Sequence, residues 1–84
     1  MSAINREQLL ARVTTSRDRL AVLSARTSNP ELLRRISEAD AIAAALDAEC
    51  HRSAGVSTSL HDRVASLIRM VNHLTLDFTR DAVE

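Results

Sequence analysis

The sequence predicts an all-α fold of three long helices. They form either an up-down-up bundle with heptad seams or a helical hairpin whose third helix packs within an oligomer. Apolar residues recur at the heptad spacing of a coiled coil in three successive segments. The one proline and the one glycine separate these segments. The chain has a single aromatic residue, 1% of its length, and therefore few of the aromatic residues that favour β-strands. We expect one helical domain over residues 1–84.

The first helix is expected over residues 6–27. Ile4, Asn5, Gln8 and Leu9 occupy the N′, N-cap, N3 and N4 positions of a capping box with a hydrophobic staple. Its apolar seam follows a 4-3-4-3-4 spacing and comprises Leu9, Val13, Ser16, Leu20, Leu23 and Thr27. Because Ser16 and Thr27 are polar, this helix should be the least firmly held of the three.

The second helix is expected over residues 30–53. Asn29 is a suitable N-cap, and Pro30 fits the N1 position, where its missing N–H costs nothing. Gly55 should stop the helix shortly after residue 53. The same spacing gives a seam of Leu32, Ile36, Ala39, Ala43, Leu46 and Cys50.

The third helix is expected over residues 58–80. Ser57 or Ser59 can serve as its N-cap, with Asp62 three residues after Ser59. Its seam is the most apolar and comprises Leu60, Val64, Leu67, Val71, Leu74 and Phe78. If short loops make sequential helices antiparallel, the large Leu67 should lie in one layer with the small Ser16 and Ala43.

The charge balance and the single cysteine argue against several functional classes. Eleven basic and eleven acidic residues cancel, which argues against a polybasic nucleic-acid tail or an acidic activation segment. All the basic residues are arginine, as in GC-rich genomes, and we expect a bacterial source. The single Cys50 gives no disulfide framework, and residues 1–10 do not resemble a signal segment. We therefore expect a cytoplasmic protein without a membrane anchor.

The sequence does not predict an enzyme. It has no phosphate-binding glycine loop, and a bundle of this size offers little room for a substrate pocket. Ser59, His61 and Asp62 are too close in sequence to form a triad. Four residues of the types that bind metals lie on either side of Gly55: Cys50, His51, His61 and Asp62. They lack the short, fixed spacing between pairs of Cys or His that is typical of a zinc site. We expect no cofactor, no metal and no small-molecule substrate, and Cys50 should be a core residue.

Apolar residues outside the seams indicate a second buried face, made by self-association or by a partner protein. The candidate partner-binding residues are Ala41, Ile42, Ala45 and Ala48 of the second helix, with Met70 and Leu76 of the third. Val22 also points away from the seams. Two other interpretations stay open: scattered exposed apolar residues are normal, and alanine is the best helix former on a solvent face.

Arginines follow one edge of the first seam. Arg12, Arg19 and Arg26 are seven residues apart and span about 21 Å of helix. Such charges at the edge of a seam can set helix pairing, with Arg17 near Asp40 or Asp47 as an example. They can instead contact phosphates, which would make the chain a small nucleic-acid-binding regulator. The pairing interpretation is favoured because no base-stacking residues accompany the arginines.

The turn at residues 28–33, Ser-Asn-Pro-Glu-Leu-Leu, resembles the S-[DN]-P-x-L-L turn between the two helices of type III secretion needle subunits, which are also about this length. This six-residue resemblance implies a secretion-system subunit or its helical chaperone. The chain departs from that pattern at Gly55, where the second helix of a needle subunit continues, and in lacking aromatic residues near its N-terminus.

Taken together, these features predict a small non-enzymatic protein–protein interaction module, such as a regulator, inhibitor or adaptor, that binds through a helical face. We expect a homo-oligomer, most simply a dimer. The alternatives are a nucleic-acid-binding regulator that uses the arginines of the first helix, and a secretion-system subunit or chaperone.

Overall fold

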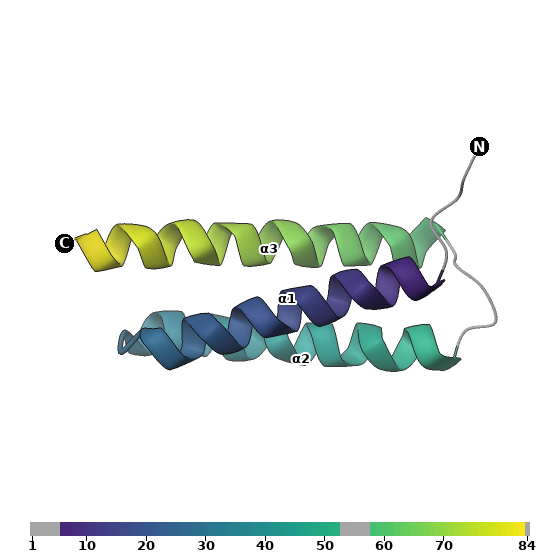
Figure 1. The fold of residues 1–84 in the computed structure, drawn as a ribbon, viewed down its shortest axis with the longest axis horizontal. Helices are drawn as coiled ribbons and strands as arrows, with labels where there is room; N and C mark the ends of the chain where they lie inside the picture. The colour runs from purple at the N-terminus through teal and green to yellow at the C-terminus, as the bar shows by residue number, and fades with distance from the viewer. Residues whose placement is uncertain (1–5, 53–57, 84) are drawn as a thin grey trace.

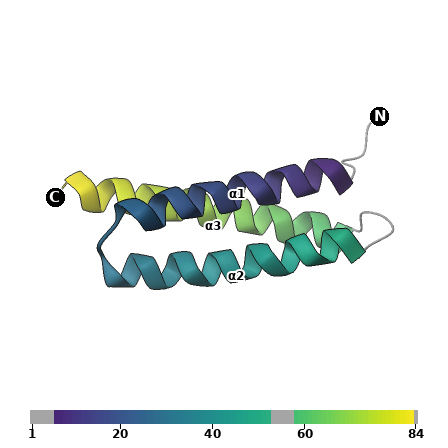
Figure 2. The same ribbon diagram turned by 60° about the horizontal axis from the view of Figure 1, so that its bottom comes forward.

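The computed structural model describes residues 6–52 and 58–83, which form three α-helices. They are α1 (Arg6–Arg26), α2 (Pro30–Arg52) and α3 (Thr58–Val83). Helices α1 and α3 run in the same direction and α2 runs opposite to both (Figure 1). A second view shows α2 lying beside the other two along most of their length (Figure 2). The predicted all-α three-helix up-down-up bundle is thus confirmed.

Every pair of helices packs together within the single chain. The bundle is elongated, measuring 45 × 24 × 17 Å, because the three helix axes lie side by side rather than crossing steeply. Since α3 packs on both α1 and α2 of its own chain, the alternative in which the third helix needs another subunit is not the arrangement adopted.

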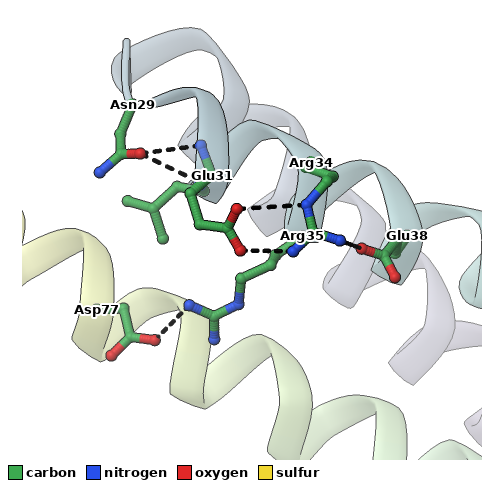
Figure 3. Close-up of polar contacts among 7 residues, drawn as sticks. Asn29, Glu31, Arg34, Arg35, Glu38 and Asp77 are labelled. Atoms are coloured by element: carbon green, nitrogen blue, oxygen red, sulfur yellow. Dashed lines mark hydrogen bonds and ion pairs between the residues drawn. The ribbon is translucent and has the colours of Figure 1, made fainter.

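The turn before α2 has the predicted N-cap. The Oδ1 atom of Asn29 accepts hydrogen bonds from the backbone N–H of Glu31 at 3.0 Å and of Leu32 at 3.4 Å (Figure 3). Pro30 is the first helical residue and has no N–H to satisfy. The backbone N–H of Leu33 then donates to the carbonyl of Asn29 at 3.0 Å. This local chemistry explains why α2 begins where the sequence predicts.

Helices α1 and α3 begin at Arg6 and Thr58 as predicted, whereas other ends differ slightly from expectation. Helix α1 ends at Arg26, one residue early. Helix α3 begins at Thr58, so Ser59 lies inside the helix and its predicted role as N-cap is wrong. The predicted caps Asn5 and Ser57, residue 53 at the predicted end of α2, and the Gly55 stop lie outside the described residues.

Helix α3 continues to Val83, three residues beyond the predicted end. No proline or glycine follows Arg80 to interrupt it. In addition, the Nδ2 atom of Asn29 donates to the Oδ1 atom of Asp81 at 3.3 Å. The turn between α1 and α2 therefore contacts the last turns of α3, which favours their helical conformation.

The core matches the three predicted seams closely. All seam positions are buried except Thr27 and Phe78, which are half-buried at one end of the bundle. Phe78 still packs against the core. Ser16 is the one buried polar residue among those described. Cys50 is fully buried and is a free thiol, as predicted for a core residue.

Ion pairs on α2 connect it to both neighbours. The Nε atom of Arg17 on α1 lies 3.2 Å from the Oδ1 atom of Asp40, confirming one of the two predicted pairings. Arg35 reaches from α2 to Asp77 of α3 at 2.8 Å (Figure 3). Further along the bundle, Glu49 of α2 pairs with Arg63 of α3. These contacts fix how α2 is placed lengthwise against each partner helix.

Candidate partner-binding surfaces

Ile42 and Met70 come together on one side of the bundle. Both large apolar side chains are exposed, at 41% and 37% respectively. Ile42 lies seven residues after Arg35 and seven before Glu49, whereas Met70 lies midway between Arg63 and Asp77. The two ion pairs Arg35–Asp77 and Glu49–Arg63 therefore bracket an apolar pair at the same edge of the seam.

This edge is hollowed into two adjoining cavities, both lined by Ile42 and Met70, which we call the α2–α3 groove. One cavity of about 370 Å³ is also lined by Arg35, Glu38, His73 and Leu74. The other, of about 540 Å³, is also lined by Ser59, Asp62, Arg63, Ser66 and Leu67. His73, on the side of α3 away from the seam, thus borders this groove rather than simply facing solvent.

Most of the described charged residues around the α2–α3 groove have a partner of opposite sign, the exception being the exposed Asp62, which contacts His61. Besides the two ion pairs between helices, Glu38 pairs with Arg34 at 2.7 Å (Figure 3). The hydrogen bond from Arg63 lowers the pKa of Glu49 from its ordinary value, so this carboxylate stays ionised to lower pH than a free glutamate. The wall of the groove is therefore apolar in the middle and charge-balanced at its ends.

The alanines predicted to bind a partner form a separate stripe. Ala41, Ala45 and Ala48 are all exposed on α2. Their spacing of four and three residues places them on one face of the helix, opposite the buried seam. Ala45 follows Ile42 by three residues, so the stripe meets the α2–α3 groove at that point. The small side chains leave the outer surface of α2 open to close approach by another helix.

Leu76 does not share a surface with Met70. The two residues are six positions apart, which places them about 120° apart around α3. Leu76 is 62% exposed and points nearly opposite to the buried seam of α3. The six predicted partner-binding residues thus divide into the α2–α3 groove, the alanine stripe and the separate Leu76.

The predicted arginine stripe lies along the junction of α1 and α3. Arg12 and Arg19 line a cavity of about 260 Å³, the α1–α3 groove, whose other lining residues are Ala11, Thr15, Ser16, Ile68, Val71 and Asn72. The Nη1 atom of Arg19 donates to the Oδ1 atom of Asn72 at 3.5 Å, a long contact. Arg26 is exposed seven residues further along the same edge.

The contact between Arg19 and Asn72 sets the register of α1 against α3, and this register identifies the residues of α3 that face Arg12 and Arg26. In these parallel helices, Ala65 lies level with Arg12, and Thr79 lies level with Arg26. Neither residue is acidic. None of the three arginines forms an ion pair with a described carboxylate. Helix pairing by charge therefore holds for Arg17 but does not explain the arginine stripe.

The residues near the second turn of the chain do not form a chemical site within the described part. Cys50 is buried, and burial raises the pKa of its thiol, with Asp47 and Glu49 adding to the increase. The Nδ1 atom of His51 contacts the backbone carbonyl of Asp47 at 2.8 Å. Among residues 6–52 and 58–83 no three His, Cys, Asp or Glu side chains converge as a metal site would require.

Sequence reasoning found most of the residues on these surfaces but not how they combine. The apolar residues outside the seams were identifiable from helical periodicity alone. The signal that could have paired Ile42 with Met70 is the position of the charges around them. Arg35 and Glu49 lie seven residues on either side of Ile42, and Arg63 and Asp77 lie seven residues on either side of Met70. That signal becomes specific only once the two helices are known to be neighbours.

Comparisons with protein-family models, curated proteins and solved structures found no match to this chain. None of the helices in the described ranges combines the length and apolar character needed to cross a membrane. The two grooves are accordingly the features from which a function can be inferred.

Proposed function

We propose that this protein is a small non-enzymatic interaction module that self-associates through the α2–α3 groove. The observation that carries the proposal is the pairing of exposed Ile42 and Met70 at the centre of this groove. Contact with a second copy would remove both side chains from water and supply the dominant favourable term in association. The free buried thiol of Cys50 fits a reducing compartment, and we place the module in the cytoplasm.

A second copy is the favoured occupant because the groove is compatible with itself. In a two-fold dimer each residue of the interface meets the same surface on the partner subunit. Such a contact is disfavoured when a surface carries charge of one sign. Here Arg35 and Arg63 are balanced by Asp77 and Glu49, so the groove carries no large excess of one sign and two copies can approach, with the exposed Asp62 at its edge.

The alanine stripe extends this surface in the proposed dimer. Ala45 lies beside Ile42 on α2, and its small side chain permits the helix of the second copy to approach closely. A stable interface buries roughly 800 Å² per subunit, more than the two apolar side chains alone can offer. The contribution of the stripe makes an area of that size attainable.

The test is the solution mass of charge-insertion variants, measured by light scattering and sedimentation across a range of protein concentrations. We expect the wild type to dimerise and Ile42→Glu to be monomeric, because an unpaired carboxylate in the interface should weaken association by about 100-fold, or about 3 kcal/mol. Ala45→Glu should dissociate the dimer as well. Both variants should keep the helical circular dichroism of the wild type, since these positions are exposed.

Val22→Glu is the matched control. Val22 is a large apolar residue exposed to 51%, but it lies on α1, outside the groove. This variant should remain a dimer. A wild type that is monomeric at millimolar concentration would refute the proposal, as would dissociation by Val22→Glu but not by Ile42→Glu.

A further inference from the structure

We propose that the α1–α3 groove binds an acidic amphipathic helix from a different protein, which lies along α1 and α3 and completes a four-helix bundle. The proposal does not depend on self-association through the α2–α3 groove. Three features of the surface support it: unopposed arginines at heptad spacing, two highly exposed apolar side chains at one level of the bundle, and small residues that leave a hollow between the helices.

The charge distribution is the first feature. Each ion pair that joins two helices in the described structure involves α2. Across the junction of α1 and α3, the positions facing Arg12, Arg19 and Arg26 hold Ala65, Asn72 and Thr79. The groove itself is lined by two arginines and no acidic residue. In helical bundles, charges at the edge of a seam are usually paired with opposite charges on the neighbouring helix. These three arginines of α1 have no such partner among the described residues of α3, so they are available to a carboxylate of another protein.

Exposed apolar residues form the second feature. Val22 and Leu76 are the two most exposed large apolar side chains among the described residues, at 51% and 62%. Val22 follows Arg19 by one turn of α1, and Leu76 follows Asn72 by one turn of α3. Because α1 and α3 are parallel (Figure 1) and Arg19 contacts Asn72, Val22 and Leu76 are at about the same level along the bundle.

The hollow between the helices is the third feature. Ala11, Thr15 and Ser16 give α1 small side chains where it lines the groove, and the half-buried Ile68 lies at the wall contributed by α3. The resulting cavity of about 260 Å³ can receive apolar side chains from a helix packed above it. Val22 and Leu76 are not part of this lining and lie on the outer sides of α1 and α3, where a helix seated on the groove can reach them only from its edges.

This combination favours an acidic helix over the other occupants. A nucleic acid would use the arginines but would gain little from Val22 and Leu76. A second copy placed groove against groove would bring arginines of like charge together. Four of the five carboxylates of its α2 are already engaged in ion pairs with arginine, and the fifth, Asp47, contacts His51; the four are Glu31, Glu38, Asp40 and Glu49. The partner helix should carry acidic residues seven apart beside an apolar seam.

The probe is a synthetic helical peptide of 25 residues with leucine at its seam positions and glutamate at one flanking position of every heptad. A control peptide has glutamine in place of each glutamate. Binding is measured by fluorescence anisotropy of the labelled peptides. We expect the acidic peptide to bind at least tenfold more tightly than the control, and its affinity to fall as salt rises from 50 to 500 mM.

Two variants and one matched control locate the site. The triple variant Arg12→Ala, Arg19→Ala, Arg26→Ala should bind the acidic peptide at least tenfold more weakly, and Leu76→Ser should also weaken binding. The control triple variant Arg17→Ala, Arg34→Ala, Arg52→Ala loses the same charge away from the groove and should bind as the wild type does. Circular dichroism confirms that each variant is folded.

A labelled DNA duplex and a single strand of 20 nucleotides provide the competing test. The proposal is overturned if the acidic peptide does not bind at millimolar concentration, or if the control triple variant loses binding equally. It is also overturned if DNA binds more tightly than the acidic peptide and requires the arginines but not Leu76. Because Ile42→Glu should leave peptide binding unchanged, failure here is separable from failure of the proposed dimer.

Discussion

The layer containing Leu67 provides a demanding test of the packing. Leu67 is 1% exposed, and the two residues predicted to share its layer, Ser16 and Ala43, are both buried and small. Leu67→Ala removes three carbon groups, worth about 2.4 kcal/mol of transfer free energy at about 0.8 kcal/mol each. The void that remains adds about 1 to 2 kcal/mol, because small neighbours cannot fill it. We expect the free energy of unfolding to fall by about 3.4 to 4.4 kcal/mol.

A volume exchange within the layer tests whether these residues face each other. Ala43→Leu alone should destabilise the protein by about 1 to 3 kcal/mol through overpacking. Combined with Leu67→Ala, it restores the volume of the layer, so the double variant should be more stable than the sum of the single effects predicts by at least about 2 kcal/mol. Urea denaturation followed by circular dichroism at 222 nm measures all four proteins.

Two results would refute this reasoning. Additive losses in the double variant would show that Ala43 and Leu67 do not share a layer. A loss below about 1.5 kcal/mol for Leu67→Ala would show that the site collapses or is less buried than described. Leu60→Ala, at one end of the same seam, is the control, because Ala43→Leu is too distant to rescue it.

The remaining predictions concern the helix cap, the buried thiol and pH. Asn29→Ala should reduce the free energy of unfolding by about 1 kcal/mol and the melting temperature by about 4 to 8 °C, and an unchanged melt would contradict the capping role. Cys50 should react with a thiol reagent at pH 8 only when the protein unfolds, so labelling of the native protein at the rate of free cysteine would contradict its burial. Since burial raises the pKa of this thiol, stability should fall as pH rises above the unfolded value of about 8.5. Arginine partners lower the pKa values of Glu31 and Glu49, so their contribution should be present above the unfolded value of about 4.3 and should disappear as pH falls through the lower folded values. Glu49→Gln should reduce that dependence in urea titrations from pH 2 to 6.

Helix α2 shows how much of the fold could be predicted. Asn29 and Pro30 give a local signal for its start, because the cap and the first turn involve residues close in sequence. Its buried face follows from heptad spacing, and every residue assigned to it is buried. The end of α3 could not be predicted in the same way, since its last turns contact Asn29 from a distant part of the chain.

The candidate surfaces show where sequence reasoning reaches its limit. Helical periodicity identified Ile42, Met70, Val22 and Leu76 as lying outside the seams, and all four are exposed. The predicted partner-binding set joined Met70 with Leu76, whereas the structure places Met70 beside Ile42 and Leu76 level with Val22. Periodicity within a helix specifies a direction around its own axis but carries no information about which residue of another helix lies opposite.

The sequence by itself determined the three helices and their buried seams, because capping and heptad repeats act between residues that are near in the chain. Only the tertiary structure decided which outward-facing residues meet. The inter-helix contacts of Arg35, Glu49 and Arg19 set the register between helices, and that register pairs Ile42 with Met70 while leaving the arginine stripe without acidic neighbours. The physical reason is that exposed positions tolerate many side chains, so the arrangement of the surface follows from how the buried seams pack.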